Sequence, residues 1–128
     1  MYLSHIHVTM PEGGEAIARL FYSGYLGLRE LPKPNCPQVR GGLWFDAGGL
    51  TLHLSVEEQR MGADTQRHFG LGCGDVDGLK ARLKAAGVEI EEGPPVAWKR
   101  FFIRDPFGNR IEIHVPGFCP DDVASGGY

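Results

Sequence analysis

The first half of the chain predicts the element order β-α-β-β-β. Polar and apolar residues alternate over residues 3–10, which is typical of a half-buried strand. Apolar side chains recur at helical spacing over residues 15–25, and Gly27 stands where many helices end. Three short strands are expected after the helix, at residues 28–31, 42–46 and 50–56.

The second half repeats this order. Residues 68–74 alternate as a strand does, and residues 76–86 predict a helix with Leu79 and Leu83 facing inward. Gly87 again stands at the helix end. The three strands expected after this helix are at residues 88–90, 100–104 and 110–115.

These patterns predict one α+β domain over residues 1–128. It would contain two tandem βαβββ modules, module 1 at about residues 3–57 and module 2 at about residues 67–116, joined by a linker and followed by a loose tail at residues 117–128. Each module is too small to bury its own sheet. We therefore expect an eight-stranded, cup-shaped mixed sheet with the helices on its outer face.

The repeat also places metal-competent side chains at matching positions. An Asp opens a turn at Asp46 and again at Asp105, and the seventh residue after each is His53 or Glu112. The first strand of each half carries one more histidine, His5 or His68. The duplication therefore predicts one metal site shared by the two halves, although a single histidine on a strand is most often structural.

Strand alternation separates an apolar face from a polar one. Leu52 and Leu54 share a face, and the other face of that strand carries His53. The apolar faces would pack on the helices, and the polar faces would line the cup. The side chains expected to line it are His5, His7, His53, His68, Glu112 and His114.

Composition narrows the possible partners. The net charge is −3 and no run of Lys or Arg occurs, which argues against a nucleic-acid or anionic-membrane partner. No apolar run reaches the roughly 18 residues of a membrane span, and no signal peptide is evident. The 3 cysteines form no Cys-x-x-Cys motif, so a cytoplasmic protein with free thiols is the simplest expectation.

Several segments resemble the vicinal oxygen chelate superfamily, which includes glyoxalase I, bleomycin-resistance proteins, fosfomycin-resistance proteins and extradiol dioxygenases. The resemblance covers residues 3–116 and is strongest in the run Arg104-Asp-Pro-Phe-Gly-Asn-Arg-Ile-Glu112. The segments 11–14, 32–34 and 41–45 also resemble a bacterial subgroup of glyoxalase-like proteins. The resemblance implies a fold of paired βαβββ modules, often dimeric and sometimes with modules exchanged between chains.

The resemblance also implies a ligand set. His5 and His68 match the first-strand ligands of the superfamily, and Glu112 matches the last-strand carboxylate. His53 falls where glyoxalase I would have a Glu. In members with only three protein ligands, the position of His53 is not a ligand, so it stays open whether His53 is a fourth ligand or a general base.

Two imidazoles and one carboxylate leave coordination positions for a substrate. The set suits Zn, Mn, Ni, Co or Fe without choosing among them. Such a metal would act as a Lewis acid on neighbouring substrate oxygens, with Glu112 exchanging a proton. His53 could serve as ligand or base, because an imidazole titrates near neutrality.

Other residues are candidates for substrate contact. Arg100 could bind a substrate carboxylate or phosphonate, with Phe102 on the same face. Trp44 could form a pocket wall. His7 and His114 each lie two residues from a proposed ligand on the same face, as residues that orient ligands or touch substrate often do.

Three functions are compatible with these residues. The first is a glyoxalase-like, metal-dependent lyase or isomerase that acts on a small oxygenated substrate, working as a homodimer. The second is a metal-free small-molecule or drug-binding protein of the bleomycin-resistance type. The third is a non-haem iron dioxygenase, which a 2-His-1-carboxylate set permits.

Overall fold

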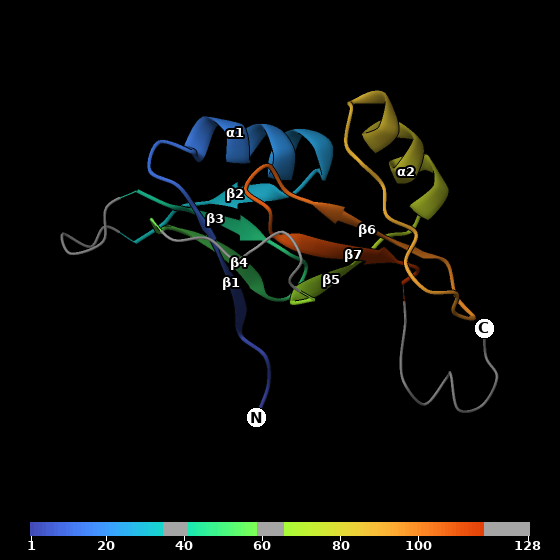
Figure 1. The fold of residues 1–128 in the computed structure, drawn as a ribbon. Helices are drawn as coiled ribbons and strands as arrows, with labels where there is room; N and C mark the ends of the chain where they lie inside the picture. The colour runs from blue at the N-terminus through green and yellow to red at the C-terminus, as the bar shows by residue number, and fades with distance from the viewer. Residues whose placement is uncertain (35–40, 59–65, 117–128) are drawn as a thin grey trace. The chain divides into compact units, whose positions relative to one another are not determined.

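The computed structural model describes residues 1–34, 41–58 and 66–116. The chain divides into two compact units. Figure 1 shows the helices and strands along the chain, coloured by residue number. Unit 1 is Met1–Thr65 with Asp105–Asn109, and unit 2 is Gln66–Arg104 with Arg110–Tyr128. The predicted tail, and residues 59–65 of the predicted linker, lie outside the described residues.

Unit 1 contains a four-stranded mixed sheet in the order β1-β4-β3-β2. β1 pairs in parallel with β4, which pairs antiparallel with β3, and β3 pairs antiparallel with β2. The predicted strands of the first half are all confirmed, with small changes at their ends. Their bounds are His5–Met10 for β1, Arg29–Leu31 for β2, Leu43–Asp46 for β3 and Thr51–Val56 for β4.

The predicted helix at residues 15–25 forms, but its hydrogen bonding changes partway. The α-helix α1 (Glu15–Arg19) passes directly into the π-helix η1 (Leu20–Tyr25). The buried face of this segment carries Ala18, Phe21 and Tyr22. Ile17 and Leu20, which the sequence pattern places on the apolar stripe, are instead 54% and 56% exposed.

Residues from late in the chain complete the core of unit 1. The Tyr22 ring packs against Phe45, with ring centroids 5.4 Å apart. Its hydroxyl donates a 2.6 Å hydrogen bond to Asp105, which is itself buried. The side-chain amide of Asn109 donates to the Thr9 carbonyl at 2.8 Å. The turn at residues 105–109 is thus a structural part of unit 1.

Unit 2 contains a three-stranded sheet in the order β5-β7-β6 and one helix. The helix is capped by Asp75, whose carboxylate accepts from the Gly78 amide, and Leu79 and Leu83 are buried as predicted. Its elements are β5 (His68–Gly72), α2 (Val76–Ala85), β6 (Arg100–Arg104) and β7 (Arg110–His114).

The predicted strand at residues 88–90 is wrong. The chain there makes a single bridge, between Glu91 and Phe102, and no ladder. Gly93 takes a φ of 70° just after the bridge, and Pro94 and Pro95, which lack an amide hydrogen, follow it. Pairing therefore cannot extend beyond the bridge toward the C-terminus, and on its other side residues 88–90 form no ladder.

The fold is α+β, as predicted. The described residues form strands β1 to β7, in sheets of four and three, so the expected single sheet of eight strands is not confirmed. Among the described residues, no helix is long and apolar enough to cross a membrane.

Candidate functional site

In unit 1, three strands bring an aromatic stack together. His53 on the central strand β4 pairs in register with His7 on β1 and with Trp44 on β3. Its imidazole lies parallel to Trp44, with ring centroids 4.0 Å apart, and to His5, with centroids 4.6 Å apart. Because β4 lies between β1 and β3, the His53 ring is held from both sides.

Hydroxyl groups orient each imidazole of this stack. The His53 Nε2 atom lies 2.9 Å from the Thr51 hydroxyl, and the His5 Nδ1 atom lies 2.9 Å from the Ser4 hydroxyl. His7 makes a 2.6 Å contact from its Nε2 atom to the Ser55 hydroxyl. One nitrogen of each ring is thereby engaged.

The surroundings of His53 favour its neutral form. Burial lowers the pKa of the imidazole from its usual 6.5, and the neighbouring His5 and His7 rings lower it further. A neutral imidazole has a lone pair that can accept a proton or bind a metal ion. His53 is therefore suited to either of the two roles predicted for it.

A cavity of about 250 Å³ adjoins this stack within unit 1. Trp44, His53 and His7 line it, in agreement with their being on one face of the sheet. Lys33 and Ser55 also line it, and the sequence did not single them out. Ser55 could have been found from its alternation with His53, and Lys33 lies in the segment 32–34 that carries part of the family resemblance, which by itself assigns the lysine no role.

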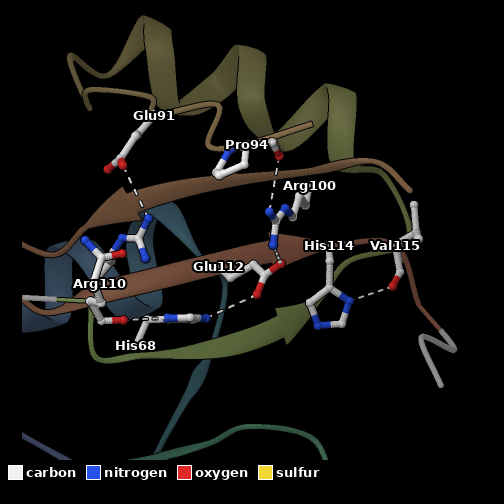
Figure 2. A network of polar contacts seen from close by, with 9 residues as sticks. His68, Glu91, Pro94, Arg100, Arg110, Glu112, His114 and Val115 are labelled. Carbon is white, nitrogen blue, oxygen red and sulfur yellow. Dashed lines mark hydrogen bonds and ion pairs between the residues drawn. The ribbon is translucent and has the colours of Figure 1, made fainter. Parts of the chain in front are cut away.

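In unit 2, Glu112 is the centre of a polar network (Figure 2). Arg100 donates from Nη1 to its Oε1 atom at 3.1 Å, and the His68 Nε2 atom lies 3.3 Å from its Oε2 atom. The side chains of Arg100 and Glu112 are only 16% and 15% exposed. Both oxygens of the carboxylate therefore have a partner in a partly desolvated position.

The hydrogen bonding of His68 determines which nitrogen faces Glu112. Its Nδ1 atom lies 2.9 Å from the Gln66 carbonyl oxygen, which can only accept, so Nδ1 carries a hydrogen. The Nε2 atom then faces a carboxylate oxygen. These two atoms attract only if the ring also carries a proton on Nε2 or if a cation lies between them.

One of the three guanidinium nitrogens of Arg100 has no hydrogen-bond partner among the described residues. Its Nη2 atom donates to the Pro94 carbonyl at 3.2 Å, and its guanidinium lies near the Trp98 and Phe102 rings, 5.8 and 5.1 Å from their centroids. Its Nε atom is buried and has no hydrogen-bond partner within the described part of the chain. A buried unpaired N–H is costly, so this atom favours an external acceptor.

The predicted substrate contact Phe102 is 3% exposed, and charged groups surround its ring. The guanidinium of Arg110 lies 3.8 Å from the ring centroid and donates to Glu91 at 3.3 Å. Phe102 also lines a cavity of about 270 Å³ in unit 2, together with Glu91. The sequence did not single out Arg110, since an arginine on a polar strand face resembles an ordinary surface residue.

His114, another predicted substrate contact, is anchored to the main chain. Its Nδ1 atom lies 2.7 Å from the Val115 carbonyl oxygen (Figure 2). A Cβ on Gly70 would come within 3.2 Å of the His114 ring, so the glycine makes room for the imidazole. His114 thus lies over β5 beside the Glu112 network.

The two units share the same strand register. His5 lies opposite Thr51, five residues after Asp46, and His68 lies opposite Arg110, five residues after Asp105. His53 and Glu112 are the centres of equivalent three-strand rows, flanked by His7 and Trp44 in unit 1 and by Gly70 and Phe102 in unit 2. The predicted duplication is therefore present in the strand pairing of each unit.

Imidazole and carboxylate groups are suitable ligands for a divalent metal. Each unit, however, brings together only two of the proposed ligands, His5 and His53 in unit 1 and His68 and Glu112 in unit 2. Metal–ligand bonds of about 2.0–2.2 Å place two ligand atoms of a tetrahedral ion roughly 3.3–3.5 Å apart, and the His68–Glu112 separation is 3.3 Å. Within the described residues, however, no group of three or more His, Cys, Asp or Glu side chains is placed to hold a metal ion.

Comparison with known proteins identifies relatives over nearly the whole chain. The family model described as the Glyoxalase/Bleomycin resistance protein/Dioxygenase superfamily matches residues 3–113. A putative glyoxalase family protein from Bacillus anthracis has a similar structure, with 35% sequence identity and a TM-score of 0.79 over 90% of this chain and 94% of that chain. No curated protein matches the chain.

Two further structures are similar. The fosfomycin resistance protein FosX from Listeria monocytogenes has a TM-score of 0.79 at 20% identity, over 99% of this chain and 98% of that one, which shows a shared fold. An antibiotic binding protein from a Streptomyces species has a TM-score of 0.68 at 25% identity, over 91% of this chain and 99% of that one.

Proposed function

Because this chain belongs to the Glyoxalase/Bleomycin resistance protein/Dioxygenase superfamily, we propose that it is a metal-dependent lyase or isomerase acting on a small oxygenated molecule. The proposed ligands are His5, His68 and Glu112, with His53 as fourth ligand or general base. One observation carries the proposal: the shared strand register gives His5 and His53 in unit 1 the same positions as His68 and Glu112 in unit 2.

The hydrogen bonding of the histidines supports this ligand set. His5 and His68 each engage Nδ1 with the residue one or two positions upstream, which leaves Nε2 directed away from that contact. Such contacts commonly orient metal-binding imidazoles. Metal ligands must also be deprotonated, and the lowered pKa of His53 favours the neutral ring.

The chain's own residues have separate tasks in this proposal. A bound divalent metal would supply Lewis acidity toward the substrate oxygens. Arg100 holds Oε1 of Glu112, so the carboxylate presents Oε2. His53, held neutral by its lowered pKa and fixed between two rings, can act as a general base toward the substrate. The unused Nε–H of Arg100 can donate to an anionic group of the substrate.

Metal titration tests the proposal. The purified protein should bind Zn, Mn, Ni, Co or Fe stoichiometrically, and the double variant His5→Ala/Glu112→Ala and the single variant Glu112→Gln should lose that binding. Glu30→Gln is the matched control, because Glu30 is a carboxylate that pairs with Arg19 away from the proposed ligands. Equal metal affinity of Glu112→Gln and the wild-type protein would contradict the proposal.

The second candidate is metal-free binding of a small molecule. It is favoured by the carboxylate of Glu112, whose two oxygens already have Arg100 and His68 as partners. The similar Streptomyces structure is of an antibiotic binding protein. A wild-type protein that binds no divalent metal at neutral pH would support this candidate. Oxygen uptake on catechols after anaerobic addition of Fe²⁺ would instead support the dioxygenase.

We also propose a cytoplasmic homodimer as the working form; the dimer is what membership in the superfamily implies. Sedimentation equilibrium measures the oligomeric state directly. A monomer at micromolar concentration would contradict the dimer without bearing on the metal.

A further inference from the structure

The cavity of unit 1 has the features of a small-molecule site by itself. It lies beside the face of β1, β3 and β4 that carries His7, Trp44 and His53, and Lys33, which follows β2, also lines it. Its volume of about 250 Å³ is slightly below that of sites for drug-sized ligands, roughly 300–1,000 Å³. It therefore suits a compact ligand.

The charge of the lining points to an anion. Lys33 lines the cavity, and among the described residues no Asp or Glu does. Its side chain is half-buried, and among the described residues it makes no ion pair. The net charge of the chain is −3, and six other Lys and Arg side chains of the described residues pair with an Asp or a Glu. A partly desolvated ammonium without a counter-charge attracts an anionic ligand.

Aromatic and apolar side chains make up another part of the lining. Trp44 and His53 are stacked with their planes 3° apart, and Leu54 lines the cavity next to them. Aromatic walls favour planar ligands, which can stack or meet a ring edge. The Ser55 hydroxyl, held by His7 at 2.6 Å, adds one polar group that can hydrogen-bond a ligand oxygen.

We propose that this cavity binds a small planar organic carboxylate, with Lys33 neutralising the carboxylate and Trp44 contacting the ring. The inference deepens the proposed function, because His53 lines the same cavity, and it names the class of substrate. Binding of the carboxylate by Lys33 does not require a metal, so this inference and the proposed metal-dependent function can be tested separately.

Benzoate is the probe, and benzamide is its neutral counterpart of the same shape. The chain has 2 tryptophans, so Trp98→Phe leaves Trp44 as the sole reporter. In buffer with EDTA, benzoate should change the Trp44 fluorescence with saturation, at least about tenfold more tightly than benzamide, as one charge-assisted hydrogen bond provides. Lys33→Met should weaken benzoate binding by a similar factor and leave benzamide unaffected.

Lys99→Met is the matched control, because Lys99 is a lysine of unit 2 that pairs with Asp77. It should bind benzoate like the parent. If Trp98→Phe does not fold, ¹H–¹⁵N spectra of the wild-type protein serve instead, and benzoate should shift the amides of Lys33, Trp44 and His53. Equal affinities for benzoate and benzamide, no saturation at tens of millimolar, or unchanged binding by Lys33→Met would overturn the inference.

The outcomes also separate this inference from the proposed function. Benzoate binding in a protein that takes up no metal would leave this inference standing and contradict the metal-dependent enzyme. Stoichiometric metal binding without benzoate binding would support the metal-dependent enzyme and contradict this inference.

Discussion

The imidazole of His53 lies flat against the indole of Trp44, with ring centroids 4.0 Å apart and planes 3° apart. His5 stacks on the same imidazole from the neighbouring strand. A protonated ring in this position would lose hydration and would be near two other imidazoles. Protonation of His53 would therefore destabilise the sheet of unit 1.

We expect His53 to titrate below its usual pKa of 6.5, because burial and the neighbouring histidines oppose protonation. The unfolded chain then binds the proton at a higher pH than the folded one. The stability from the neutral ring is complete above about pH 6.5 and is lost as the pH falls through the folded-state pKa. NMR titration of the His53 Cε1–H signal measures the midpoint.

The control is the pH dependence of unfolding in His53→Gln. The other four histidines are unchanged in that variant, so its stability should fall less between neutral and mildly acidic pH than that of the wild-type protein. Parallel curves for the two proteins, or a midpoint above 6.5, would show that the stack does not disfavour the charged ring.

Tyr22→Phe should destabilise the protein by about 1–3 kcal/mol, the usual cost of leaving a buried group without its partner. The Tyr22 hydroxyl donates at 2.6 Å to Asp105, and both residues are buried. Burial already raises the pKa of Asp105, so losing a donor leaves its carboxylate less well compensated. Chemical unfolding measures the difference.

Tyr25→Phe provides the comparison for this hydroxyl. Tyr25 is on the same helical segment and its ring contacts Phe21, but no hydrogen bond of its hydroxyl is found within the described residues. Its removal should change the free energy of unfolding by no more than about 0.5 kcal/mol. Equal effects of the two substitutions would mean that the bond to Asp105 contributes nothing.

Gly42→Ala should be more destabilising than Gly48→Ala. Both glycines have positive φ, 94° and 72°, so alanine costs about 1–2 kcal/mol at either position. At Gly42 the new Cβ would also lie 2.6 Å from the Leu54 carbonyl oxygen, whereas nothing lies within 4 Å at Gly48. Thermal or denaturant unfolding gives the order, and the reverse order would argue against this packing of β3 on β4.

Arg100→Met should cost about 1.5–3 kcal/mol, the usual value of a hydrogen bond to a charged group. It removes the partner of Glu112 in a position where both side chains are about one-sixth exposed. Arg29→Met is the control, because the Arg29–Asp46 pair is at the surface, with side chains 72% and 40% exposed. Surface pairs contribute about 0–1 kcal/mol to the free energy of unfolding. Similar losses of stability in Arg100→Met and Arg29→Met would show that the Arg100–Glu112 pair is as well solvated as the Arg29–Asp46 pair.

The sequence by itself determined the α+β class, the duplication, and the strands that carry the candidate histidines and Glu112. Those features depend on local periodicity: alternation in β4 buries Leu52 and Leu54 and leaves His53 on the other face. It also indicated the superfamily, because the run from Asp105 to Glu112 combines a turn with the strand that follows it.

Only the tertiary structure decided which side chains meet. The contacts of Tyr22 with Asp105 and of Arg100 with Glu112 join residues from different elements, and no periodicity predicts such pairs. The exposure of Leu20 and the loss of the strand at residues 88–90 likewise depend on tertiary packing, which outweighs local preference. A sequence pattern assigns a residue to a face, but long-range contacts determine its partners.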